Sequence, residues 1–92
     1  MNVVYTDAAL RDLEEILNFI SAEYPTIYGS FERRLHTSLS RIKRWPESAQ
    51  SVAEHPAVRV VPLVRYPYKI FYRVTDQSIE ILHIHHSARL TP

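Results

Sequence analysis

The last third of the chain contains three short runs of β-branched and aromatic residues, separated by two breaks of turn-forming residues. The runs are Val58–Val64, Tyr68–Val74 and Ile79–His86. Such runs are typical of an antiparallel meander, because strands joined by tight turns pair with their sequence neighbours. Pro62 lies within the first run and cannot donate to a strand ladder, so we expect an edge or a bulge at that position.

Alternation along the middle run assigns its two faces, because successive side chains of a strand point to opposite sides. The set expected to cover the helices is Tyr68, Ile70, Tyr72 and Val74. The set expected on the other side is Lys69, Phe71 and Arg73, which presents two cations around an aromatic ring.

Two amphipathic segments precede the meander and predict an antiparallel helical hairpin. The first helix is expected after the N-cap candidates Thr6 and Asp7, and to end near Tyr24, because Pro25 follows. The second is expected from about Thr26 to Trp45. The apolar stripes are Leu10, Leu13, Ile16, Leu17 and Ile20 in the first helix, and Tyr28, Phe31, Leu35, Leu39, Ile42 and Trp45 in the second.

The remaining segments complete an α+β prediction. Asn2–Tyr5 is β-prone and is expected to form a short strand, whereas Glu47–Pro56 is polar, without a clear period, and is interpreted as a connector. At 92 residues, the chain is long enough for one small domain, which we place at residues 1–92. The predicted architecture is a short strand and a two-helix hairpin packed on a small antiparallel sheet.

Composition excludes several classes of protein. The chain has no cysteine, so disulfides and thiolate metal sites are absent. The N-terminus shows no signal-peptide pattern, and no stretch approaches transmembrane length, so we expect a cytoplasmic protein. A glycine-rich phosphate loop is excluded, because Gly29 is the only glycine, and no cofactor is expected.

Charge is unevenly distributed, although the formal net charge is only +1. Residues 7–23 hold five acids and one base, whereas residues 26–45 hold five bases and one acid. One interpretation is an acidic helix beside a basic helix, with solvated outer faces. The other is a basic surface for an acidic partner or for nucleic acid.

The meander also holds the side chains that are the best candidates for binding or catalysis. Its cations are Arg65, Lys69, Arg73 and Arg89, and its histidines are His83, His85 and His86. His83 and His85 share one strand face and His86 lies on the other. No metal site is expected, because no acid is close in sequence and a third ligand would have to come from elsewhere.

The segment Arg65–Val74, RYPYKIFYRV, and the ending Ile81–Arg89, ILHIHHSAR, resemble the ParE branch of the RelE/ParE toxin superfamily. The resemblance spans nearly the whole chain. It implies the toxin of a bacterial type II toxin–antitoxin system, bound by a ParD-like antitoxin. Through that antitoxin, the complex would bind operator DNA and repress its own operon. No membrane partner is implied.

The resemblance leaves two activities open. ParE-like members are associated with inhibition of DNA gyrase, and RelE-like members are metal-independent, ribosome-dependent mRNA endonucleases. The RelE-type C-terminal tyrosine is absent, and the connector Glu47–Pro56 lacks basic residues, so gyrase inhibition without enzymatic activity is favoured. The alternatives are an endonuclease of RelE/YoeB type and a non-toxic antitoxin-binding module.

The resemblance assigns residues to each role. Under gyrase inhibition no catalytic residue is expected; an endonuclease would use Lys69, Arg89 and His85 or His86. The expected target-binding residues are Arg65, Lys69, Arg73, His83 and Arg89. The expected antitoxin-binding residues, in an apolar groove between the first helix and the sheet, are Leu13, Leu17, Phe19, Ile20 and Pro62.

Overall fold

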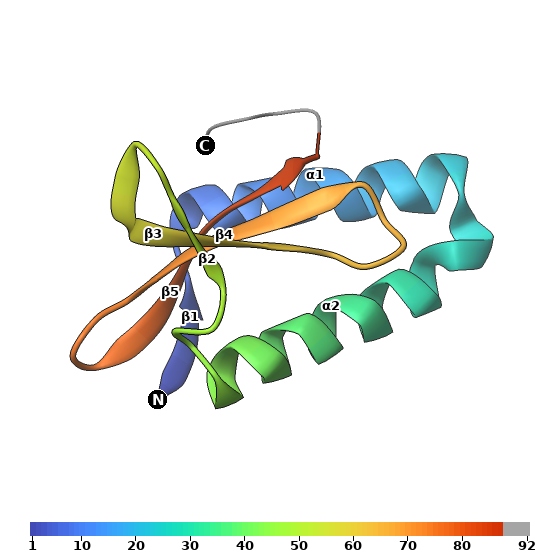
Figure 1. Ribbon diagram of the computed structural model, residues 1–92. Coiled ribbons are helices and arrows are strands. Elements are labelled where there is room, and N and C mark those ends of the chain that lie inside the picture. The colour runs from blue at the N-terminus through green and yellow to red at the C-terminus, as the bar shows by residue number, and fades with distance from the viewer. Residues whose placement is uncertain (88–92) are drawn as a thin grey trace.

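The computed structural model describes residues 1–87, which form a helical hairpin packed on a mixed sheet (Figure 1). Helices α1 (Asp7–Glu23) and α2 (Tyr28–Arg44) are joined by the short 3-10 helix η1 (Pro25–Ile27). The strands are β1 (Asn2–Tyr5), β2 (Gln50–Val52), β3 (His55–Pro62), β4 (Tyr68–Val74) and β5 (Ser78–His86).

The sheet has the strand order β1-β5-β4-β3-β2. Strands β3, β4 and β5 pair antiparallel, which confirms the predicted meander. Strand β1 pairs with β5 in parallel, from Asn2 opposite Ser78 to Tyr5 opposite Ile81, so the sheet is mixed rather than purely antiparallel. Parallel pairing is possible here because both helices and the meander separate the two strands in sequence.

The predicted connector Glu47–Pro56 is wrong in its second half. Residues 50–52 form β2, and β3 begins at His55, three residues before the predicted start. Residues 50–51 and 55–57 are exposed, so they lack the apolar alternation that marks a half-buried strand. Strand β2 pairs with β3 only as far as Val60. Pro62 therefore pairs with β4 on one side only, which fits the edge position expected for a proline.

Thr6 sets the start of α1, as predicted. Its side-chain oxygen accepts the backbone N–H of Ala9 at 3.1 Å, and its own N–H donates to the Ile81 carbonyl at 3.0 Å. The cap therefore also fixes α1 to β5. The second helix begins at Tyr28 rather than Thr26, because residues 25–27 adopt the tighter 3-10 geometry after the proline.

The main core lies between the helical hairpin and one face of the sheet. Its buried residues are Ala9, Ile16, Ile20, Phe31, Leu35, Ile42, Leu63, Ile70, Tyr72, Ile79, Ile81 and Ile84. The predicted inward set of β4 is confirmed, since Tyr68 and Val74 also pack against this core.

Two predicted core residues are exposed. Leu10 is 51% exposed because α1 turns Ala9, Ile16 and Ile20 toward the sheet and Leu10 away from it. Trp45 is also 51% exposed; it follows the last turn of α2, where the Arg44 guanidinium lies 4.7 Å from its ring centroid. Among residues 1–87, neither helix is long and apolar enough to cross a membrane.

Candidate functional site

The sheet face opposite the helices, here called the outer face, brings together two of the predicted histidines, His83 and His85, and one predicted cation, Lys69. Strand register places Lys69 opposite His85 and Phe71 opposite His83. Phe71 and His85 are 1% and 6% exposed, although neither belongs to the main core cluster. The rings of His83 and His85 lie side by side, with centroids 4.7 Å apart. The ring of His86 contacts Tyr68, with centroids 5.7 Å apart, as expected for the other face.

Asp12 of α1 completes this cluster. Its Oδ2 atom accepts the backbone N–H of Ile84 at 3.0 Å and lies 3.2 Å from His83 Nδ1 and 3.7 Å from His85 Nε2. The last residue of β5 that pairs with β1 is Ile81. Beyond it, the Ile84 N–H has no strand partner on that side, and Asp12 of α1 accepts its hydrogen bond instead. Asp12 carries no local signal for this role in the sequence, because 71 positions separate it from His83.

The predicted target-binding cations lie in different surroundings. Arg73 Nε donates to Glu80 Oε1 at 2.6 Å, so this cation is ion-paired. Arg65 lies in the β3–β4 turn with φ of 79°, in the left-handed region that side chains other than glycine seldom adopt. Arg89 lies outside the described residues.

Arg65 lies beside two further arginines that the sequence did not single out as site residues. Arg33 and Arg34 of α2 line a hollow of about 340 Å³ together with Arg65 and Tyr66. The Tyr66 hydroxyl is held by a 2.5 Å hydrogen bond with the Ser30 hydroxyl. Three guanidinium groups around one hollow make this end of the molecule suited to an acidic partner.

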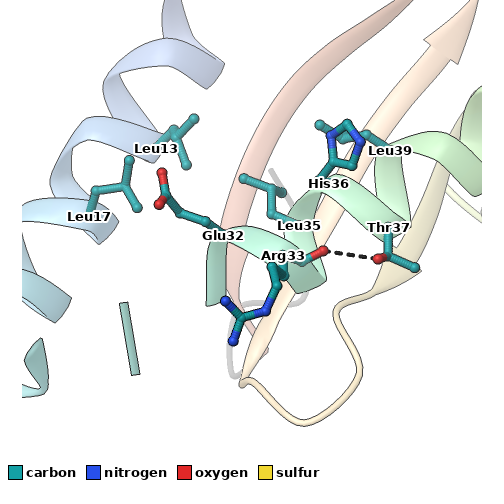
Figure 2. Close-up of a pocket in the computed structure, with 8 residues that line it drawn as sticks. All are labelled: Leu13, Leu17, Glu32, Arg33, Leu35, His36, Thr37 and Leu39. Atoms are coloured by element: carbon teal, nitrogen blue, oxygen red, sulfur yellow. Dashed lines mark hydrogen bonds between the residues drawn. The ribbon is translucent and has the colours of Figure 1, made fainter. Parts of the chain in front are cut away.

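A second hollow, of about 600 Å³, lies between α1 and α2 and is here called the interhelical groove (Figure 2). Its lining residues are Leu13, Leu17, Glu32, Arg33, Leu35, His36, Thr37 and Leu39. Figure 2 shows Leu13 and Leu17 projecting from α1 toward α2, with polar side chains at the rim. Thr37 Oγ1 donates to the Arg33 carbonyl at 2.9 Å and is thereby oriented.

The predicted antitoxin-binding residues are divided among three hollows. Leu13 and Leu17 line the interhelical groove. Phe19 and Ile20 line a hollow of about 420 Å³ with Pro67 and Tyr68, near η1. Pro62 lines a third hollow, of about 310 Å³, under α2. The structure therefore brings the predicted residues together as two pairs, with Pro62 apart, and not as one continuous groove.

Residues 3–91 match the family model described as the ParE toxin of the type II toxin–antitoxin system, parDE. The chain belongs to this ParE family. A curated relative, Toxin RelE2 of Caulobacter vibrioides (strain ATCC 19089 / CIP 103742 / CB 15), is 35% identical over 89 residues and covers 96% of this chain and 97% of its own length. These two matches confirm the family that the β4 and β5 motifs suggested.

Two solved structures share the fold of this ParE family member. The chromosomal ParDE TA system from P. aeruginosa aligns with a TM-score of 0.79 and 24% identity, covering 94% of this chain and 95% of that one. The YoeB/ParE toxin from Agrobacterium tumefaciens aligns with a TM-score of 0.66 and 13% identity, covering 94% and 98%. Both confirm the predicted α+β arrangement.

Proposed function

We propose that residues 1–92 form a single-domain toxin that inhibits DNA gyrase in the bacterial cytoplasm. The proposal rests on ParE family membership. The burial of His85 is the observation that favours gyrase inhibition over RNA cleavage. The His85 ring is 6% exposed and lies beside the Asp12 carboxylate, so a bound RNA has little access to it. A general acid or base must reach the atom whose proton it transfers.

A ribosome-dependent endonuclease is the second candidate function, and one observation favours it. Lys69 and His85 are cross-strand partners, and Asp12 can orient an imidazole of the same cluster. A cation, an imidazole and a carboxylate are the groups that metal-independent phosphodiester cleavage uses. The burial of His85 counts against this function, and the other candidate, His86, is exposed but lies on the opposite face of β5 from Lys69.

Neutralisation by a ParD-like antitoxin is the other part of the proposal. The interhelical groove has a leucine floor, from Leu13, Leu17, Leu35 and Leu39, and its polar lining carries Arg33 and His36 together with one acid, Glu32. An amphipathic helix fits the apolar floor, and acidic residues on its polar side would face the arginines of the neighbouring hollow, Arg33, Arg34 and Arg65. Arg33 also lines the hollow that contains Arg34 and Arg65, so one acidic segment can contact both surfaces. The antitoxin would carry the complex to operator DNA and repress the operon.

Induction of the toxin alone in bacterial cells tests the proposed target. The expected result is induction of a DNA-damage reporter and filamentous growth, with loss of supercoiling activity when purified toxin is added to gyrase. The double substitution of His85 and His86 by Gln separates the two candidate functions. Under gyrase inhibition it keeps toxicity, provided that its circular dichroism spectrum matches the wild type.

Three results would contradict gyrase inhibition. One is rapid translation arrest with cleaved mRNA while gyrase supercoiling remains intact. Another is loss of toxicity in the folded double variant, which would support the endonuclease. The third is a harmless phenotype with antitoxin binding retained, which would identify a non-toxic binding module.

A further inference from the structure

We propose that Asp12, His83 and His85 form a binding site for a divalent transition-metal ion, with Zn²⁺ as the best-suited ion. The two histidines come from β5 and the carboxylate from α1, so the ion would join the helix to the open edge of the sheet. This inference is independent of whether gyrase or the ribosome is the target.

The two distances from the carboxylate to the imidazole nitrogens are close to those that zinc requires. Zinc–nitrogen and zinc–oxygen bonds of about 2.0–2.2 Å in a tetrahedral arrangement place neighbouring ligand atoms about 3.3–3.6 Å apart. Asp12 Oδ2 lies 3.2 Å from His83 Nδ1 and 3.7 Å from His85 Nε2. All three ligand atoms lie within 4.8 Å of one another, so the set can converge on one ion when the imidazoles rotate toward it.

The backbone holds the ligands near this geometry before any ion binds. His83 and His85 share one face of β5, and their ring centroids are 4.7 Å apart. The Ile84 N–H between them donates to Asp12 Oδ2 at 3.0 Å and keeps the carboxylate directed at the gap between the rings. Outer hydrogen bonds of this kind orient the ligands of metal sites.

The surroundings of the three ligands favour a cation and give it access. A hollow of about 150 Å³ beside the cluster is lined by Asp12, by His85 and by Glu15, a second acid from α1, but not by His83. The side chains of His83 and Asp12 are 32% and 22% exposed, whereas that of His85 is 6% exposed. His85 is thus the buried ligand, whereas His83 and Asp12 are partly open to solvent, so water can take a fourth coordination position.

The donor set selects the kind of ion. Imidazole nitrogen suits Zn²⁺, Ni²⁺ and Cu²⁺, whereas Mg²⁺ and Ca²⁺ prefer sites built from oxygen alone. Two imidazoles and one carboxylate are also a set found in zinc sites that keep a position open. The chain has no cysteine, so any zinc ligands must be histidine or acidic side chains.

Zinc titration of the full-length chain, without a histidine tag, tests this site. We expect one Zn²⁺ per chain by calorimetry, a melting temperature that rises with Zn²⁺ concentration, and no rise with Mg²⁺. The temperature should rise because an ion that binds only the folded chain stabilises it. The variants D12N, H83Q and H85Q should each lower zinc affinity at least about tenfold.

Matched controls are available in two exposed histidines outside the cluster, His36 of α2 and His55 of β3. The variants H36Q and H55Q should bind Zn²⁺ as the wild type does. Because H85Q alters a buried residue and can impair folding, H83Q, at a half-buried position, is the deciding variant. Its folding is checked by circular dichroism without metal.

Two results would overturn the site. The first is the absence of saturable Zn²⁺ binding by the folded wild-type chain. The second is a zinc affinity in folded H83Q and D12N equal to that of the wild type, which would mean that zinc binds elsewhere. A separate spectroscopic check uses Co²⁺, whose visible absorption bands should appear with the wild type and be lost with H83Q; bands that persist in H83Q count against the proposal.

Discussion

Asp12 of α1 accepts the backbone N–H of Ile84 in β5 at 3.0 Å. A helix carboxylate thus takes the place of a neighbouring strand at the point where β1 no longer pairs with β5. The same oxygen contacts His83, so one side chain fixes the backbone of the strand and the orientation of a candidate functional residue.

Replacement of Asp12 by Ala should lower the free energy of unfolding by about 1–3 kcal/mol, because it leaves the partly buried Ile84 N–H without its acceptor. Asn retains an oxygen that can accept this bond, so D12N should lose less than D12A. Urea denaturation in buffer with a metal chelator measures both effects without a contribution from bound ions. Equal stability of D12A and the wild type would show that water replaces the carboxylate at no cost.

Tyr72 joins β4 to the segment after α2, because its hydroxyl donates to the Pro46 carbonyl at 2.6 Å. The ring is fully buried, so Tyr72→Phe should cost about 1–3 kcal/mol through loss of this bond. Tyr24→Phe is the matched control, because Tyr24 is 56% exposed, and it should change stability by less than about 0.5 kcal/mol. Similar stabilities of the two variants in urea denaturation would contradict the proposed role of the bond.

One buried and two partly buried tyrosines also predict how stability depends on pH. Burial raises the pKa of Tyr5, Tyr68 and Tyr72 above the ordinary value of 10.0. The folded chain therefore retains these protons at a pH where the unfolded chain has lost them. This contribution to stability is complete below pH 10 and decreases as the pH rises through the raised values. Urea denaturation from about pH 9 upward should show this decrease, with a shallower slope for Tyr72→Phe.

Parts of the fold with local signals were predictable. The cap at Thr6 and the alternation in Tyr68–Val74 each depend on neighbouring residues, and the structure confirms both. Strand β2 was missed because Gln50 and Ser51 are exposed on a short outermost strand, where no apolar pattern is required. Leu10 was placed in the core because helical spacing alone does not show which of two adjacent stripes faces the sheet.

The candidate site was predictable only in its local half. The shared face of His83 and His85 follows from strand periodicity. The contribution of Asp12 depends on α1 running along the edge of β5, a tertiary relationship that no local pattern contains. The hollow between Arg65 and α2 likewise depends on how the β3–β4 turn packs against that helix.

The ion pair between Arg73 and Glu80 should contribute little to stability. The two side chains are 51% and 27% exposed, and exposed pairs contribute about 0.2–1 kcal/mol. Glu80→Gln should therefore change the free energy of unfolding by less than about 1 kcal/mol, and added salt should reduce the difference. A double-mutant cycle with Arg73→Ala isolates the pair. A coupling energy above about 2 kcal/mol would mean that the pair is far better shielded than its exposure indicates.

The interhelical groove predicts a contrast between two leucines of α1. Leu13 lines the groove, whereas Leu10 is 51% exposed and lies outside it. Leu13→Arg should weaken binding of a ParD-like antitoxin at least about tenfold, because a charged side chain would replace part of the apolar floor. Leu10→Arg should leave the affinity within about twofold of the wild type. Calorimetry with the cognate antitoxin measures both, after melting curves show that each variant is folded. Equal affinities of the two folded variants would place the antitoxin on another surface.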